Sequence, residues 1–329
     1  MSKKGLKVLK YILAAGLAAL LVYLALRKMD WHIFLNALYD TKWLWVAASL
    51  AFALAALVFR TERWRLLMIP INSEIKRKDL WDACNIGNLL SVVLPWVSFL
   101  IRCGAVTDKK TPYDKTVGTI LMERAWDMMM VFILIVLAIV LNTGEIANWF
   151  IDNIALKIAG RWKIAPILVG AVGVLALAIY VIFKLKDRSK LAGKLAGWIA
   201  GIFDGFKTFA QTPKKIPFVL LSASIWVSYF MMCFCVFKAV PSLSHLGISD
   251  ALFISVVGNL SSLLPVPGGF GAYHYFVATA LSALYGVSWE IGILFASLTH
   301  ETRSLMLVAL GAISLISSQK RIKIEDSRE

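Results

Sequence analysis

The sequence predicts an all-α, polytopic membrane protein with about six full transmembrane helices and two opposed, broken re-entrant hairpins in an inverted-topology repeat. Hydrophobic residues make up 59% of the 329 residues, more than a soluble chain of this length can bury. Basic residues, which give a formal charge of +15, flank the apolar runs, as is typical of topology signals and contacts with anionic lipid. Prolines interrupt two further apolar segments, as expected of helices that break within a membrane.

Six apolar stretches are long enough, or nearly so, to cross a bilayer as single helices. They are residues 8–27, 42–60, 117–142, 164–183, 215–238 and 290–317. The first begins among four lysines at residues 3–10 and lacks a convincing small-residue cleavage site, so we expect an uncleaved signal anchor. The two interrupted stretches are 80–106, broken at Pro95, and 250–286, broken at Pro265 and Pro267.

Clusters of lysine and arginine orient these segments. They lie at residues 3–10, 60–78, 109–115, 184–215 and 320–328. The positive-inside rule places them, and both termini, on the cytoplasmic side of the membrane, which we expect to be a bacterial-type inner membrane. The less basic loops are then external, at residues 28–41, 143–163 and 239–249. Segment 80–106 must therefore enter and leave from the cytoplasm, and segment 250–286 from outside, so both are predicted to be re-entrant.

The order of elements repeats with opposite orientation. Each half contains two spans, a re-entrant segment and a further span, and GNLLSVVLP at 87–95 resembles GNLSSLLP at 258–265. Short apolar segments also match by chance, but the shared order favours an inverted repeat whose re-entrant tips meet near the bilayer midplane. The predicted organisation is a first repeat, an external linker, a second repeat and a cytoplasmic tail, at 1–142, 143–163, 164–317 and 318–329.

Charged side chains within a predicted span are costly and are therefore functional candidates. One group lies in each half of the chain: Glu123, Arg124 and Asp127, and His300, Glu301 and Arg303. We predict that Arg124 and Arg303 face an internal cavity and hold an anionic head group, because the planar guanidinium matches phosphate or carboxylate. Structural ion pairs between glutamate and arginine are the alternative, and both roles can hold together. Arg102, at the end of the first broken segment, is assigned to the same cavity.

The broken segments supply the remaining candidates. Their tips carry asparagine, proline and glycine: Asn88, Pro95, Asn259, Pro265, Pro267, Gly268, Gly269 and Gly271. Proline leaves carbonyl groups without a donor, and glycine lets a ligand approach backbone amides. His274 lies near the start of the following half-helix, where a proton or substrate role competes with that of a core histidine. At the cytoplasmic end of the second span, Arg60, Arg63 and Arg65 either anchor the span or contact a lipid phosphate.

No catalytic pattern stands out. The sequence has no nucleophile elbow, zinc-protease motif, phosphate-binding loop or dinucleotide fingerprint. We therefore expect no enzymatic activity, no catalytic residues, no cofactor and no metal. A basic module with interleaved aromatic residues is also missing, so a nucleic-acid partner is not expected. The cysteines lie in or beside apolar segments and are expected to pack as small apolar side chains: Cys84, Cys103, Cys233 and Cys235.

Three motifs carry a family resemblance: RTERWRLL after the second span, MERAWD near the start of 117–142, and LPVPGGFGAYH. The chain resembles the lysylphosphatidylglycerol synthase transmembrane region, also called the UPF0104 or flippase-like family, over nearly its whole length. The resemblance implies a lipid-translocating module, which in bifunctional synthases moves aminoacylated phosphatidylglycerol to the outer leaflet. Because the chain ends at residue 329, the aminoacyl-transferase domain of those synthases is not expected.

Two departures from the family pattern leave the identity of the lipid open. The family often has Gly-Glu soon after the first re-entrant proline, where this sequence reads PWVSFLIR, and it usually has glutamate near the position of His274. Both changes alter charges that could touch the substrate. Lysylphosphatidylglycerol in particular is therefore not implied.

We predict that the protein moves an anionic or aminoacylated phospholipid, or a polyprenyl-phosphate-type lipid, between leaflets, passively or driven by an ion gradient. A separate lipid-modifying enzyme is a possible partner. Two alternatives stay open: an ion-coupled secondary transporter of a small soluble anion, and an enzyme, or enzyme partner, that uses a lipid-linked sugar. A lateral opening would favour the lipid, a closed polar vestibule the soluble anion, and a nucleotide-sugar pocket at 76–110 the enzyme.

Overall fold

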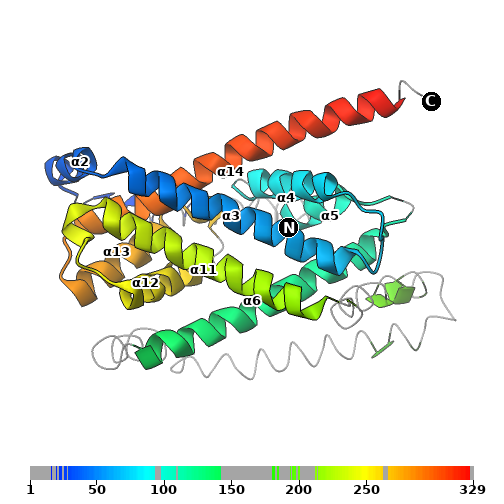
Figure 1. Ribbon diagram of the computed structural model, residues 1–329, viewed down its shortest axis with the longest axis horizontal. Helices are drawn as coiled ribbons and strands as arrows, with labels where there is room; N and C mark the ends of the chain where they lie inside the picture. The colour runs from blue at the N-terminus through cyan, green and yellow to red at the C-terminus, as the bar shows by residue number, and fades with distance from the viewer. Residues whose placement is uncertain are drawn as a thin grey trace.

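The computed structural model describes residues 29–92, 98–108, 110–141, 214–261 and 266–326, with isolated residues between 16 and 27 and between 180 and 212. Every regular element in this part is helical (Figure 1). Three helices are long and apolar enough to cross a membrane: α3 (Trp43–Met68), α11 (Lys215–Ala239) and residues Trp289–Ser318 of α14 (Trp289–Asp326). These helices confirm a membrane protein and contain three of the predicted spans.

The other described helices are shorter or interrupted by charge. They are α2 (Trp31–Tyr39), α4 (Arg77–Ser91), α5 (Ser98–Gly104), α6 (Tyr113–Leu141), α12 (Ile248–Ser261) and α13 (Ala272–Tyr285), with short 3₁₀ turns at Pro241–Leu243 and Pro267–Gly269. Helix α6 contains the predicted span 117–142 up to its last residue. The predicted spans 8–27 and 164–183, and the linker 143–163, lie wholly or largely outside the described residues.

The two interrupted segments each form a pair of helices. Segment 80–106 contains most of α4 and all of α5, and segment 250–286 contains most of α12 and all of α13. Within each pair, the two helices pack against each other. Pro95 and Pro265 lie outside the described residues, at the two breaks. Whether these pairs are re-entrant, and whether the halves form an inverted repeat, stay predictions.

The turn before α13 brings the two broken segments together. Gly268, Gly269 and Gly271 have φ values of 60°, 73° and 79°, a left-handed backbone that glycine adopts without strain. A β-carbon built at Gly268 would lie 3.3 Å from the carbonyl oxygen of Val92, the last described residue after α4. The turn that follows α12 therefore meets the end of α4 closely.

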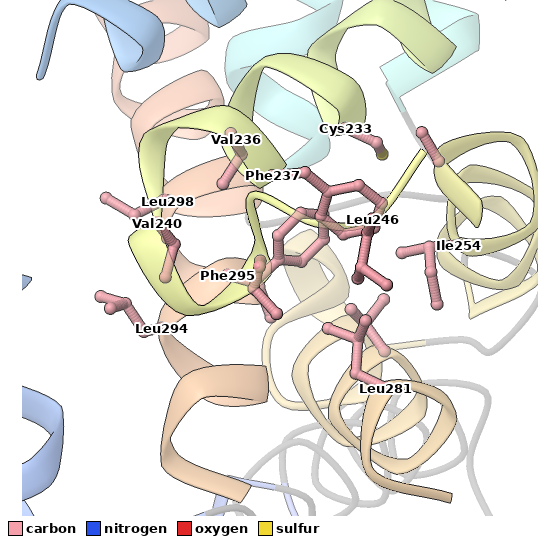
Figure 2. Packing of buried hydrophobic residues seen from close by; sticks show 14 of the residues in the cluster. Cys233, Val236, Phe237, Val240, Leu246, Ile254, Leu281, Leu294, Phe295 and Leu298 are labelled. Atoms are coloured by element: carbon pink, nitrogen blue, oxygen red, sulfur yellow. The ribbon is translucent and has the colours of Figure 1, made fainter. Parts of the chain in front are cut away.

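The most extensive helix–helix contact joins α3 and α11, which run side by side in Figure 1. Helix α14 packs against α13 at one end and against α4 further along. The largest buried cluster lies among α11, α12, α13 and α14, where the rings of Phe237 and Phe295 are 4.9 Å apart (Figure 2). This core fixes the helices that carry the residues of the second half.

The outward faces of the long helices are apolar. On α6, Met128 and Phe132 are each 67% exposed, and on α11 and α14 Ile216 and Leu305 are 74% and 70% exposed. Large exposed apolar side chains gathered on several helices are typical of a surface that contacts lipid. The charged residues discussed below therefore belong to helices whose other faces suit a bilayer.

Candidate functional site

A cavity of about 670 Å³ lies where the two broken segments meet the long helices. The described charged residues that line it are all arginines: Arg60 from α3, Arg102 from α5, Arg124 from α6 and Arg303 from α14. None of the described residues lining the cavity is an aspartate or a glutamate. The wall thus carries four positive charges and suits an anion.

Uncharged polar groups complete the wall. Both broken segments contribute asparagine and serine, including Asn88 and Ser91 from α4 and Asn259 and Ser261 from α12. The turn adds Gly268 and Gly269, and α11 and α14 add further polar residues: Tyr229, Thr299, His300 and Ser304. Hydroxyl, amide and backbone groups of this kind can complete the hydrogen bonds of a phosphate that the arginines hold.

One buried carboxylate positions two of the cavity arginines. Glu123, only 1% exposed and absent from the cavity wall, accepts from Arg60 Nε at 3.0 Å and from Arg102 Nη2 at 2.8 Å. The indole of Trp64 lies under Arg102, with 3.9 Å between the ring centroid and Cζ. Trp64 is itself fixed because its Nε1 donates to Thr119 Oγ1 at 3.0 Å. Glu123 and Trp64 therefore hold guanidinium groups against the cavity.

Arg63 does not line the cavity and ties three helices together. Its side chain is 1% exposed and contacts Asp127 at 2.6 Å, Glu123 at 3.4 Å and the hydroxyl of Ser222 at 3.3 Å. These contacts join α3 to α6 and α11. Arg65 pairs with Glu62 at 3.6 Å and also stays outside the cavity wall. Of the predicted cytoplasmic phosphate contacts, only Arg60 reaches the cavity.

Arg124 and Arg303 differ from the other two cavity arginines because neither forms an ion pair with any described residue. Arg303 lies over the ring of Tyr229, at 5.3 Å from the centroid. Arg124 is exposed as well as lining the cavity. On the same face of α6, Leu121 and Met128 are 41% and 67% exposed. Arg124 therefore lies on the cavity wall and on an apolar, exposed face of α6.

The predicted charged group of the second half forms a separate cluster. Glu301 contacts His274 Nε2 at 2.8 Å and His300 Nδ1 at 2.9 Å. His300 lines the cavity, whereas His274 and Glu301 lie behind it. Arg303 does not pair with Glu301, just as Arg124 does not pair with Glu123.

The structure thus divides the predicted site residues into two groups. Those on the cavity wall are Arg60, Asn88, Arg102, Arg124, Asn259, Gly268, Gly269, His300 and Arg303. Those that do not line it are Arg63, Arg65, Glu123, Asp127, Gly271, His274 and Glu301, and Pro267 is described only in its backbone. Sequence reasoning missed Trp64, Tyr229 and Thr299. Thr299 precedes Arg303 by one helical turn and so shares its helix face, which is the pattern that could have predicted its place on the cavity wall.

An α-helical membrane protein with an arginine-lined cavity is the class that this fold and site define. Residues 11–311 match the family model of the lysylphosphatidylglycerol synthase TM region. The chain belongs to this family, which confirms the resemblance and identifies a membrane domain of a lipid-related family. Comparisons with curated proteins and with solved structures gave no match.

Proposed function

We propose that the protein binds the anionic head group of a membrane lipid in the arginine-lined cavity and moves that lipid between leaflets. The observation that carries this proposal is the charge of the wall, four arginines with no carboxylate among its described residues. Arg124 and Arg303 form no ion pair with a described residue, and guanidinium groups within a membrane protein are costly without an anionic partner. A phosphate satisfies several of them at once through charge-assisted hydrogen bonds.

The position of Arg124 supports a lipid over a soluble anion. Arg124 joins the cavity to a face of α6 that carries exposed Leu121 and Met128. A phosphate held there can keep its acyl or prenyl chains outside, against the apolar helix surface. A soluble anion would gain nothing from this apolar rim.

The charge of the wall also bears on the class of lipid. An aminoacylated head group carries an ammonium group, which needs an acceptor with negative charge. Glu123, the carboxylate that contacts cavity arginines, is already engaged by Arg60 and Arg102, and Asp127 by Arg63. We therefore favour a simple anionic phospholipid or a polyprenyl phosphate over a lysylated lipid.

Transport in proteoliposomes tests this proposal. The protein is reconstituted with phosphatidylglycerol labelled on its acyl chain by a fluorophore that dithionite quenches from outside, and phosphatidylcholine carrying the same label serves as the comparison. We expect protein-dependent exchange of the phosphatidylglycerol. Arg124→Ala and Arg303→Ala should each slow it about tenfold or more, since each removes hydrogen bonds from a charged group.

Lys78→Ala is the matched control, because Lys78 is an exposed cation of α4 outside the cavity. Equal exchange of both lipids, unaffected by the arginine variants, would refute the proposal. Uptake of inorganic phosphate without lipid exchange would instead support the soluble-anion transporter.

A further inference from the structure

Two histidines share one carboxylate beside the cavity. Glu301 and His300 are neighbours on α14, and His274 lies in the first turn of α13. The two carboxylate oxygens of Glu301 are divided between them, Oε2 at 2.8 Å from His274 and Oε1 at 2.9 Å from His300. Both histidine side chains are nearly buried, at 12% and 13% exposed. Ionisable groups within helices of a membrane protein are functional candidates.

Hydrogen-bond chemistry fixes which nitrogens are free. An ionised carboxylate only accepts, so each imidazole must donate through the nitrogen that contacts Glu301. With both histidines neutral, Nδ1 of His274 and Nε2 of His300 are left unprotonated. Nδ1 of His274 is buried without a hydrogen-bond partner in the described part of the chain. The cluster then carries one negative charge and has two vacant sites for a proton.

One histidine of the cluster reaches the cavity. His300 lines the cavity, whereas Glu301 is 32% exposed and does not line it. Nε2 of His300, unprotonated while Nδ1 donates to Glu301, can therefore accept a proton, and the Glu301 carboxylate stabilises the imidazolium that forms. Histidine suits this task because its unperturbed titration lies near physiological pH.

Other titratable and charged groups surround the cluster. Those in the cavity or against the histidine rings are Tyr273 from α13, Tyr229 and Cys233 from α11, Cys84 from α4, Arg303 from α14, and Arg60, Arg102 and Arg124 from α3, α5 and α6. Helix α12 contributes serine, glycine and asparagine to the wall but no titratable side chain among the described residues. No described carboxylate other than Glu301 contacts either histidine. A proton on His300 therefore adds a fifth positive charge to a wall of four arginines.

We propose that His274, Glu301 and His300 form a proton-binding site that couples a pH gradient to the movement of the anionic lipid. This inference rests on the proposed function and names its driving ion. A proton on His300 strengthens anion binding, and by linkage the bound anion strengthens proton binding to the same degree. A lipid with one negative charge and one proton then cross together without net charge.

A contact between His300 and the glycine turn links proton binding to the backbone. A β-carbon built at Gly269 would lie 3.2 Å from Nε2 of His300, the nitrogen that receives the proton. The neighbouring Gly268 approaches Val92 of the first broken segment. Protonation thus acts at the point where the two broken segments meet. A bound proton shifts a conformational equilibrium only when its contacts differ between the two conformations. The contact of His300 with the glycine turn is where we expect that difference.

Leaflet asymmetry under a pH gradient tests the inference. Proteoliposomes with labelled phosphatidylglycerol are held at zero membrane potential with potassium and valinomycin, first at equal pH and then with a gradient of one pH unit. One proton per lipid predicts about tenfold enrichment of the lipid in one leaflet. Reversing the gradient should reverse the enrichment.

The variants assign the coupling to the cluster. Glu301→Gln and His274→Gln should each leave the lipid evenly distributed under the gradient, whereas His245→Gln, which alters an exposed histidine, should keep the enrichment. A wild-type protein that exchanges lipid at equal pH but shows no enrichment under a gradient would overturn the coupling alone. Enrichment that survives in Glu301→Gln would overturn the assignment of the site. A wild-type protein that exchanges no lipid at any pH would overturn the proposed function, and this inference with it.

Discussion

Replacing Glu123 with glutamine keeps the size of the side chain but removes the charge that three arginines share. Arg63 keeps its contact with Asp127, and Arg60 is 19% exposed, so both retain partial compensation. Arg102 is 6% exposed and forms no other ion pair with a described residue. Removing one partner of a buried pair typically costs about 3–5 kcal/mol. Arg60 and Arg102 both lose their only described carboxylate partner, but only Arg102 is nearly buried, so we expect Glu123→Gln to cost about 3 kcal/mol, at the lower end of that range.

Equilibrium unfolding in mixed micelles, with sodium dodecyl sulfate as the denaturant, measures this loss. Glu62→Gln is the matched control, since Glu62 is 27% exposed and pairs with Arg65 at 3.6 Å and Arg77 at 3.2 Å. Exposed pairs contribute little, so the control should lose less than about 1 kcal/mol. Equal losses in the two variants would refute the reasoning that Glu123 anchors the cavity arginines.

Two further predictions concern packing and an exposed ion pair. Gly311→Ala should lower the free energy of unfolding by about 1–3 kcal/mol in the same assay, because the new β-carbon would lie 2.8 Å from the backbone oxygen of Asn85. Gly104→Ala, which meets nothing within 4 Å, should have no such effect. In the exposed ion pair of Glu74 and Lys110, the ammonium group lowers the pKa of the Glu74 carboxyl. Both groups are therefore charged at neutral pH, and the ion pair is lost as the pH falls through that lowered pKa. A carbon-13 NMR titration of the Glu74 carboxyl should show a higher midpoint in Lys110→Ala, and an unchanged midpoint would contradict the pairing.

Sequence reasoning located the charged groups but not their partners. Charges inside apolar spans are conspicuous, which is why Arg124 and Arg303 could be assigned to a cavity from the sequence alone. The partners depend on how helices are rotated against each other. Neighbours on a helix point about 100° apart, so Glu123 faces Arg60 and Arg102 while Arg124 faces elsewhere. The sequence alone does not give this rotation, so it could not show which arginines Glu123 contacts.

The breaks in the two interrupted segments were predictable for a different reason. Proline ends a helix locally, and both interruptions fall at the prolines of 80–106 and 250–286. The approach of Gly268 to Val92 depends on long-range packing between the two halves of the chain. The order of elements predicted that the tips meet, but not which backbone groups touch.

Native mass spectrometry of the protein in mild detergent tests the central claim most directly, that the cavity binds an anionic lipid. Wild type, Arg124→Ala and the Lys78→Ala control are titrated with phosphatidylglycerol and phosphatidylcholine. The account predicts selective binding of phosphatidylglycerol, weakened by roughly tenfold to a hundredfold in Arg124→Ala and unchanged in Lys78→Ala. Equal binding of both lipids, with no loss in Arg124→Ala, would contradict it.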